Sequence, residues 1–322
     1  MGIPEYKITM LGPSGVGKTS LLTAIYEKFE DTAGKLQITI DPESKTLIQI
    51  QDCLKKLKSL TQKHNDIRIK PGQGVKGTNS ESSFFFNMGI KGKNPSLSLH
   101  FQDYPGGWIA SNPENIDKVV EFLRESVAVL IPIDATAIME KNGKYHEYIN
   151  LGTTVTALIQ RAYQNLDSPR LVILAPVKCE LYMQKQKGEE LLRRVDEEYK
   201  KLIEFFQSEN LRANVAVVKI PVQTVGNVRF SRLEEKEEQE PEFYFCRTRI
   251  NASYEPKDSE QPIKYLLQFI LKLHLEKRNP VVKLFLKLLK LDKPFREAAT
   301  RFAQMPINPN CKVLQGDKWL DI

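Results

Sequence analysis

Residues 12–19 have the types and spacing of a loop that binds phosphate. Their sequence is Gly-Pro-Ser-Gly-Val-Gly-Lys-Thr, which matches the pattern G-x-x-x-x-G-K-[ST]. The glycines permit a tight turn that brings several backbone N–H groups together, and a helix beginning there adds its positive end. The Lys18 ammonium suits the β- and γ-phosphates of a nucleotide, and the Thr19 hydroxyl suits Mg²⁺. This phosphate loop therefore predicts a nucleoside triphosphate site.

The flanking residues supply the elements that such a loop needs. An apolar run over 6–11 predicts a buried strand, and apolar residues at helical spacing predict a helix over 20–29. A chance glycine-rich turn would not explain both neighbours. The residues expected to bind nucleotide here are Gly12, Ser14, Gly15, Val16, Gly17, Lys18, Thr19 and Ser20.

Asp103 is a second candidate for metal binding. It closes an apolar strand pattern over 97–101 and is followed by Pro105 and Gly106. An acidic side chain at this point is suited to hold Mg²⁺, and the Gly106 backbone N–H is suited to approach a γ-phosphate. The alternative is an Asp that merely begins a turn.

Together these residues resemble a Ras-like P-loop GTPase of the translation-factor-related class. The resemblance rests on residues 15–22 (Gly-Val-Gly-Lys-Thr-Ser-Leu-Leu), a hairpin, and residues 103–106 (Asp-Tyr-Pro-Gly), and it covers about residues 5–276. It implies GTP or GDP as ligand and Mg²⁺ as cofactor. The layout also resembles GTPase domains of bacterial conflict and defence systems, because its base-reading motifs diverge.

The resemblance further implies a threonine, just before the hairpin, that binds Mg²⁺ and closes a switch loop. Thr78 stands at that place, with Ser80 and Ser82 as rivals. On this basis the catalytic residues are expected to be Lys18, Thr78 and Gly106, and the metal ligands Thr19, Thr78 and Asp103.

The guanine-reading motif departs from the family pattern Asn/Thr-Lys-x-Asp. Residues 177–180 are Val-Lys-Cys-Glu. The stem of Lys178 could lie over a purine, and Glu180 could accept hydrogen bonds from guanine N1 and N2, but Val177 cannot supply an amide. Val-Gln-Thr at 222–224 replaces the family's Ser-Ala-Lys. Two alternatives remain open. Lys178 and Glu180 could be surface residues without a role in nucleotide binding, or the nucleotide could be ATP in place of GTP.

Gly107 stands where active family members carry a water-orienting Gln. Slow intrinsic hydrolysis is expected unless a partner helps, and Trp108 is suited either to dock a partner or to pack internally. The leading hypothesis is a GTP-binding switch with slow Mg²⁺-dependent hydrolysis, acting through a partner protein. The alternatives are a non-catalytic nucleotide-binding interaction module and a P-loop ATPase.

Alternating strand and helix patterns predict an α/β fold of the P-loop type. Its mixed, mostly parallel sheet is flanked by helices and carries one antiparallel edge hairpin. Strands are expected at 83–90, 96–102, 127–133, 171–175, 215–220 and 243–250, and helices at 42–60, 113–125, 151–166, 189–206 and 262–275.

The domain boundaries follow from the same patterns. A GTPase-like domain is expected over 1–277, with a helical insertion at about 30–77 and an extra loop or hairpin at about 229–261. A basic amphipathic helical extension and tail are expected over 278–322.

The net charge of +7 is concentrated near that extension, where residues 272–301 hold nine Lys and Arg against three Asp and Glu. Lys283, Lys287 and Lys290 lie on one face of an expected helix beginning at 279. Packing against its own domain is favoured, and peripheral contact with an anionic membrane is the alternative. No specific nucleic-acid partner is indicated, and four scattered cysteines without metal spacing favour a reducing cytoplasm.

Overall fold

The computed structural model describes residues 3–61, 68–69, 81–235, 240–276 and 291–322. Within these residues eight strands form a central sheet in the order β11-β8-β7-β6-β1-β5-β4-β2. The five inner strands β8 to β5 run parallel, and β4, β2 and β11 run antiparallel to their neighbours. The strands are β1 (Glu5–Met10), β2 (Ile38–Pro42), β4 (Ser82–Ile90), β5 (Leu97–Asp103), β6 (Ala128–Asp134), β7 (Arg170–Val177), β8 (Val215–Lys219) and β11 (Lys312–Gln315). This is the mixed, mostly parallel sheet that the sequence predicts.

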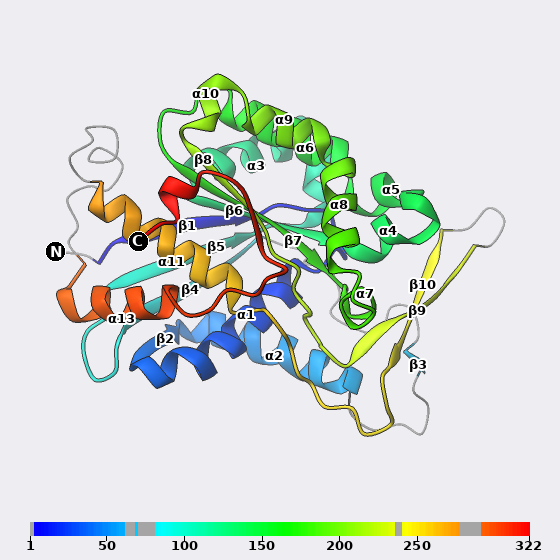
Figure 1. The fold of residues 1–322 in the computed structure, drawn as a ribbon, viewed down its shortest axis with the longest axis horizontal. Helices are drawn as coiled ribbons and strands as arrows, with labels where there is room; N and C mark the ends of the chain where they lie inside the picture. The colour runs from blue at the N-terminus through cyan, green and yellow to red at the C-terminus, as the bar shows by residue number, and fades with distance from the viewer. Residues whose placement is uncertain (1–2, 62–67, 70–80, 236–239, 277–290) are drawn as a thin grey trace.

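Helices cover both faces of the sheet, which explains why its inner strands are almost entirely buried (Figure 1). All residues of β6 and β7 are buried. One face packs against α1 (Lys18–Ala33), α2 (Ser44–Thr61), α11 (Gln261–Leu275) and α13 (Lys293–Ala303). The other packs against α3 (Pro113–Glu125), α6 (Gly152–Tyr163), α8 (Gly188–Glu198) and α9 (Lys200–Phe206).

Shorter helices follow several of the strands. They are α4 (Ala135–Met139), α5 (His146–Asn150), α7 (Glu180–Gln184) and α10 (Glu209–Arg212), together with the 3₁₀ turns η1 (Gly34–Leu36), η2 (Gly106–Ala110), η3 (Glu140–Gly143) and η4 (Asp317–Trp319). The expected helix over 189–206 is divided into α8 and α9 because Tyr199 leaves helical geometry, with φ −103° and ψ 19°.

The insertion after α1 contributes more than the expected helix. α2 confirms the helix predicted over 42–60, but β2, which precedes it, is an additional strand. β2 pairs antiparallel with β4 and takes the sheet edge, so the predicted hairpin of β4 and β5 lies one strand inward. Five residues with short alternation are too weak a pattern to predict such a strand from sequence.

In the described part of the chain a second, three-stranded sheet lies beside the main one (Figure 1). It joins β3 (Arg68–Ile69), β9 (Val228–Glu234) and β10 (Glu242–Arg247) in the order β3-β10-β9. β10 confirms the extra strand expected over 243–250, and β9, which pairs with it, lies where an extra loop or hairpin is expected. A salt bridge of 2.8 Å joins Glu235, at the end of β9, to Lys144 beyond η3.

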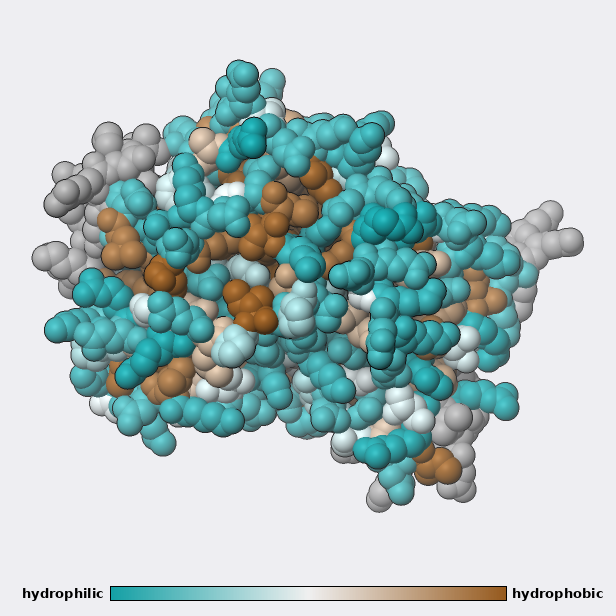
Figure 2. Space-filling view, in the orientation of Figure 1, coloured by the Kyte–Doolittle hydropathy of each residue, from teal (hydrophilic) through white to brown (hydrophobic). Residues whose placement is uncertain are grey.

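The C-terminal segment packs back onto the core. β11 pairs with β8, and the Trp319 indole N–H donates to the Ala213 carbonyl at 2.9 Å. Figure 2 shows a mostly hydrophilic surface on this side, with hydrophobic side chains gathered around the crossing of the C-terminal segment. The helix expected to begin at 279, including Lys283, Lys287 and Lys290, lies outside the described residues.

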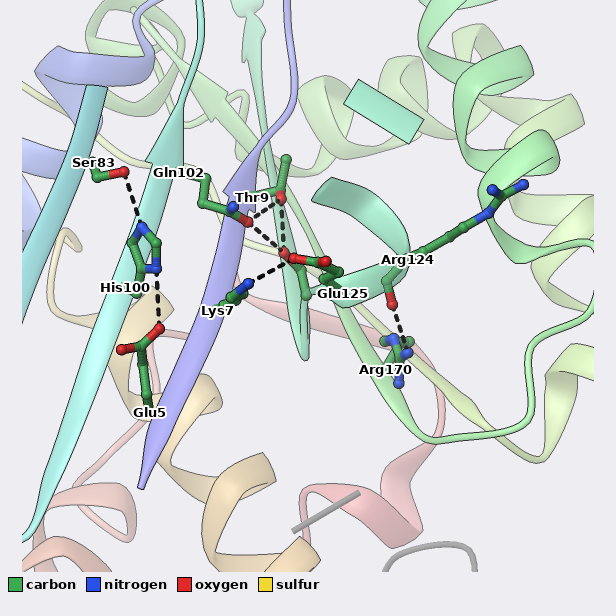
Figure 3. A network of polar contacts seen from close by, with 10 residues as sticks. Glu5, Lys7, Thr9, Ser83, His100, Gln102, Arg124, Glu125 and Arg170 are labelled. Atoms are coloured by element: carbon green, nitrogen blue, oxygen red, sulfur yellow. Dashed lines mark hydrogen bonds and ion pairs between the residues drawn. The ribbon is translucent and has the colours of Figure 1, made fainter. Parts of the chain in front are cut away.

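Polar contacts join β1, β5 and the end of α3; they are buried at Thr9 and Gln102 and exposed at Lys7 and Glu125 (Figure 3). Thr9 contacts Ser126 at 2.7 Å and donates to Gln102 at 3.4 Å, while Lys7 pairs with Glu125 at 2.6 Å. β6 begins two residues after Ser126, so the bond between Thr9 and Ser126 holds the start of β6 beside β1. Because β1, β5 and β6 run parallel, their carboxyl ends lie at one edge of the sheet.

Candidate functional site

The phosphate loop occupies the turn between β1 and α1. Gly15 (φ 77°) and Gly17 (φ 117°) have left-handed backbones, which glycine adopts without strain. Gly17 caps the N-terminus of α1, so the positive end of that helix faces the loop. Val16 is fully buried and anchors the loop, while Ser14 and Gly15 are exposed. The predicted loop residues are therefore brought together in one turn that is exposed at Ser14 and Gly15.

Lys18 lies under this loop rather than in solvent. Its side chain is only 6% exposed, and its ammonium donates to the carbonyls of Gly12 at 3.0 Å and Pro13 at 3.2 Å. The Asp103 carboxylate is 3.8 Å away. Burial lowers the pKa of Lys18 below its usual value, and Asp103 acts against that shift. A phosphate arriving here would favour the charged ammonium and exchange for the loop carbonyls.

Thr19 and Asp103, the expected metal ligands, are in direct contact. The Thr19 hydroxyl donates to the Asp103 carboxylate at 3.1 Å. A hydroxyl and a carboxylate are the hard oxygen donors that Mg²⁺ prefers, and Mg²⁺ characteristically completes its shell with phosphate oxygens and water. Across the described ranges no group of three or more His, Cys, Asp or Glu could hold a metal without such help.

The two glycines after Asp103 have different surroundings. A Cβ added to Gly106 would lie 2.0 Å from the Ser14 backbone nitrogen and 2.2 Å from the Pro13 carbonyl carbon, whereas a Cβ on Gly107 would have no heavy atom within 4 Å. Gly106 therefore brings its backbone against residues 13 and 14 of the phosphate loop, and only glycine fits there. Gly107 is open and can carry a side chain.

Aromatic rings hold this second loop. Tyr104 is fully buried and stacks on Trp108, with centroids 6.2 Å apart and planes at 16°. The Lys118 ammonium lies 5.7 Å from the Trp108 ring, and Lys18 lies 5.5 Å from the ring of Tyr104. The same aromatic pair thus lies against both the loop lysine and Lys118 of α3, and it links the phosphate loop to the partly exposed Trp108 through packed side chains.

Lys178 reaches the phosphate loop from the end of β7. Its backbone is left-handed (φ 54°), and its ammonium donates to the Gly15 carbonyl at 3.2 Å. The same ammonium lies 2.5 Å from the Asp134 carboxylate. This contact with residue 15 places Lys178 beside the site where the sequence analysis expects it.

Glu180 is turned inward. Only 2% of its surface is exposed, and one carboxylate oxygen accepts from the backbone N–H groups of Val225 at 3.1 Å and Gly226 at 3.4 Å. Burial raises the pKa of Glu180, and these amide bonds together with Lys178 act in the opposite direction. The contact joins Glu180 to the loop after β8. That loop contains residues 222–224, which stand in place of the family's Ser-Ala-Lys.

That loop is held from its other side as well. Gln223 and Lys257 exchange backbone hydrogen bonds at 3.0 and 2.9 Å, and the Glu255 N–H donates to the Val225 carbonyl at 3.1 Å. A Cβ on Gly226 would lie 1.7 Å from the Glu255 carbonyl oxygen, so the two segments touch. The region expected as an extra loop or hairpin therefore supports this end of the site.

Asp134 is a residue at the site that the sequence analysis does not name; it directly follows the strand expected at 127–133. It ends β6, neighbours β7 in the sheet and meets Lys178 there. Its signal in the sequence is an acidic residue directly after an apolar run. Thr78 and Ser80 lie outside the described residues, and the rival Ser82 is buried in β4 opposite Asp103. Ser20 lies in the first turn of α1 and is partly buried.

A protein family described as Double-GTPase 2 matches residues 7–225 of the chain. No curated protein matches the chain significantly. Among solved structures, the signal recognition particle receptor SRb-GTP/SRX complex from Chaetomium thermophilum is 17% identical with a TM-score of 0.36, covering 70% of this chain and 93% of that one.

The S. cerevisiae Ski7 GTPase-like domain bound to GTP is 13% identical with a TM-score of 0.37, covering 69% of this chain and 43% of that one. A structure of Sup35 complexed with GDP is 12% identical with a TM-score of 0.31, covering 69% of this chain and 38% of that one.

Proposed function

The chain belongs to the Double-GTPase 2 family, and from this premise we propose that it is a GTP-binding switch with slow, Mg²⁺-dependent hydrolysis. Membership agrees with the resemblance to GTPases in residues 15–22 and 103–106. The observation that carries the proposal is the convergence of Lys18, Thr19 and Asp103, with 3.1 Å between the hydroxyl and the carboxylate.

The phosphate side of the site suits a triphosphate. The N–H groups of the phosphate loop and the start of α1 supply donors, and Lys18 supplies a cation for the β- and γ-phosphates. Thr19 and Asp103 would hold Mg²⁺, which neutralises charge on the phosphate oxygens. Gly106 would offer its N–H to the γ-phosphate, and Thr78 would close the first switch loop.

The base side of the site suits guanine. The Lys178 stem would lie along the purine while its ammonium stays on the Gly15 carbonyl. The Glu180 carboxylate, oriented by the Val225 and Gly226 amides, would accept from guanine N1 and N2. GTP and GDP are therefore the proposed ligands.

Slow hydrolysis follows from Gly107, which has no side chain to orient water. A protein partner that supplies the missing group is therefore part of the proposal, and the partly buried Trp108 is suited to meet it. Triphosphate would order the residues around Thr78 and Gly107, and hydrolysis would release them.

The proposed organisation keeps the GTPase-like domain at 1–277 and the extension at 278–322, although β11 and Trp319 pack on the main core. No helix in the described ranges is long and apolar enough to span a membrane. We propose that the protein is cytoplasmic. The alternative is peripheral contact with a membrane through Lys283, Lys287 and Lys290.

A non-catalytic nucleotide-binding module is the second candidate. It is favoured because Gly107 has no side chain to orient water, although the structure leaves room for one. Nucleotide would then stabilise the fold without turnover. Single-turnover hydrolysis separates the two candidates. Slow release of phosphate that cell extract accelerates supports the switch, and no release under either condition supports the module.

Ligand identity is tested by thermal unfolding with GTP, GDP, ATP or ADP, each with and without Mg²⁺. The expected result is stabilisation by the guanine nucleotides, with the Mg²⁺ effect lost in Asp103→Asn. Equal stabilisation by adenine and guanine nucleotides would favour the ATPase alternative, and a Mg²⁺ effect retained in Asp103→Asn would exclude Asp103 as a ligand.

A further inference from the structure

Asp134 lies at the carboxyl end of β6 with its side chain 6% exposed. Its two carboxylate oxygens have separate partners. Oδ1 accepts the Thr136 backbone N–H at 2.9 Å and the Thr136 hydroxyl at 2.5 Å, while Oδ2 lies 2.5 Å from the Lys178 ammonium. One oxygen thus caps α4, and the other faces the nucleotide site.

Lys178 depends on this carboxylate for its position. A lysine has a flexible stem and three donors, so a single carbonyl does not fix it. Here the ammonium is shared between the Gly15 carbonyl at 3.2 Å and Asp134. The pair is partly buried, with side chains 31% and 6% exposed, and is therefore less screened than a surface ion pair.

The backbone of Asp134 is itself fixed from α5. The buried Asn150 side chain accepts from the Asp134 N–H at 2.7 Å and donates to the Asp134 carbonyl at 3.2 Å. The same amide donates to His146 Nδ1 at 3.2 Å. The Asp134 carboxylate that contacts Lys178 thus belongs to a residue whose backbone N–H and carbonyl are both hydrogen-bonded.

This arrangement lies where the chain lacks a side-chain amide, because Val177 precedes Lys178. We propose that Asp134 is a positioning residue for nucleotide binding, holding the Lys178 side chain across the base side of the site. The inference rests on the proposed function, since it requires a nucleotide to bind there. It assigns Asp134 no contact with the nucleotide itself, because its effect passes through Lys178.

Asp134→Asn separates this role from helix capping. Asn is as good an N-cap as Asp, so the bond to the Thr136 N–H can persist while the charge facing Lys178 is lost. Lys178→Met keeps an unbranched stem and removes the ammonium. Asp196→Asn is the matched control, since Asp196 makes a similar 2.6 Å pair with the buried Lys219 outside the site.

The measurements are equilibrium affinity for GTP and GDP, and thermal unfolding without nucleotide, for wild type, each single variant and the Asp134→Asn/Lys178→Met double variant. We expect Asp134→Asn to weaken both affinities about tenfold, as for loss of one charge-assisted contact. Lys178→Met should weaken them at least as much, the double variant should match Lys178→Met alone, and Asp196→Asn should bind like wild type.

Wild-type affinity in Asp134→Asn would overturn the inference while leaving the proposed function intact. An equal further loss when Asp134→Asn is added to Lys178→Met would also overturn it, because the effect would then not pass through Lys178. A wild-type protein that binds neither GTP nor GDP would overturn the proposed function and the inference together.

Discussion

The phosphate side and the base side of the site are built in different ways. The phosphate side comes from two short segments, residues 12–19 and 103–106, which match a known pattern and lie at the ends of adjacent parallel strands. The base side joins Asp134, Lys178 and the loop at 223–226, which follow the ends of three different strands. Its sequence departs from the family's guanine-reading pattern.

The difference shows what each side has to satisfy. Phosphate binding uses backbone N–H groups and one lysine, so its geometry is set by glycines that few other residues can replace. Base recognition uses side chains, and a side chain can be repositioned by new partners. Here Asp134 and the Val225 and Gly226 amides are such partners for Lys178 and Glu180.

The largest expected effect is on the phosphate side. Lys18→Ala should abolish stabilisation by nucleotide, which at a thousandfold excess over Kd amounts to about 4 kcal/mol in the wild type. Thermal unfolding with GTP and Mg²⁺ measures it. As a control, Lys7→Ala removes a different lysine, one that lies on β1 and pairs with Glu125. This variant should keep the full stabilisation by nucleotide. A Lys18→Ala protein that is still stabilised would show that the base side alone binds nucleotide.

Glu180→Gln tests the base side. Gln keeps an oxygen for the Val225 and Gly226 amides, so the nucleotide-free protein should unfold at nearly the same temperature. The preference for GTP over ATP should fall by about 1.5–3 kcal/mol, because a charged acceptor for guanine is lost. Competition binding measures this preference. If it is unchanged, Glu180 supports the loop without reading the base.

Gly106 and Gly107 provide an internal comparison within the phosphate side. Gly106→Ala should destabilise the protein by about 1–3 kcal/mol, because the new methyl group would overlap the Pro13–Ser14 backbone. Gly107→Ala has room and should stay within about 0.5 kcal/mol of wild type. Chemical unfolding measures both. Equal costs would mean that the loop does not lie against residues 13 and 14.

The smallest effect concerns pH on the base side. Burial lowers the pKa of His146, and nearby Glu147 acts against that shift. The unfolded state then binds more protons, so stability should be complete above the ordinary histidine pKa of about 6.5 and fall as pH drops below it. In His146→Gln, which keeps an acceptor for Asn150, the loss of stability between pH 7.5 and 5.5 should be smaller. An unchanged loss would assign it to other groups.

The sequence brings the residues of the proposed phosphate side together because their contacts are local or lie at the ends of strands with clear apolar patterns. Lys18, Thr19 and Asp103 come together as expected. The parallel pairing of the inner strands follows from strand–helix alternation, whereas their order is seen only in the structure. β2 and β11 are not predicted, because each is short and gains its place only by pairing with a distant strand.

The base side is less predictable for a physical reason. The motif comparison identifies Lys178 and Glu180, but not the groups that fix them. Asp134 follows an ordinary strand, and nothing local marks its pairing with a residue 44 positions away. The support of the 223–226 loop by Glu255 and Lys257 likewise requires the fold.

The pairing of β11 with β8 also constrains how the chain is made. Once residues 1–219 have left the ribosomal exit tunnel, the five parallel strands can assemble, but the outer edge of β8 still presents unpaired backbone groups. That edge is covered only after residues 312–315 have left the exit tunnel. We therefore expect nascent chains halted before residues 312–315 emerge to aggregate more readily than nascent chains in which these residues have emerged.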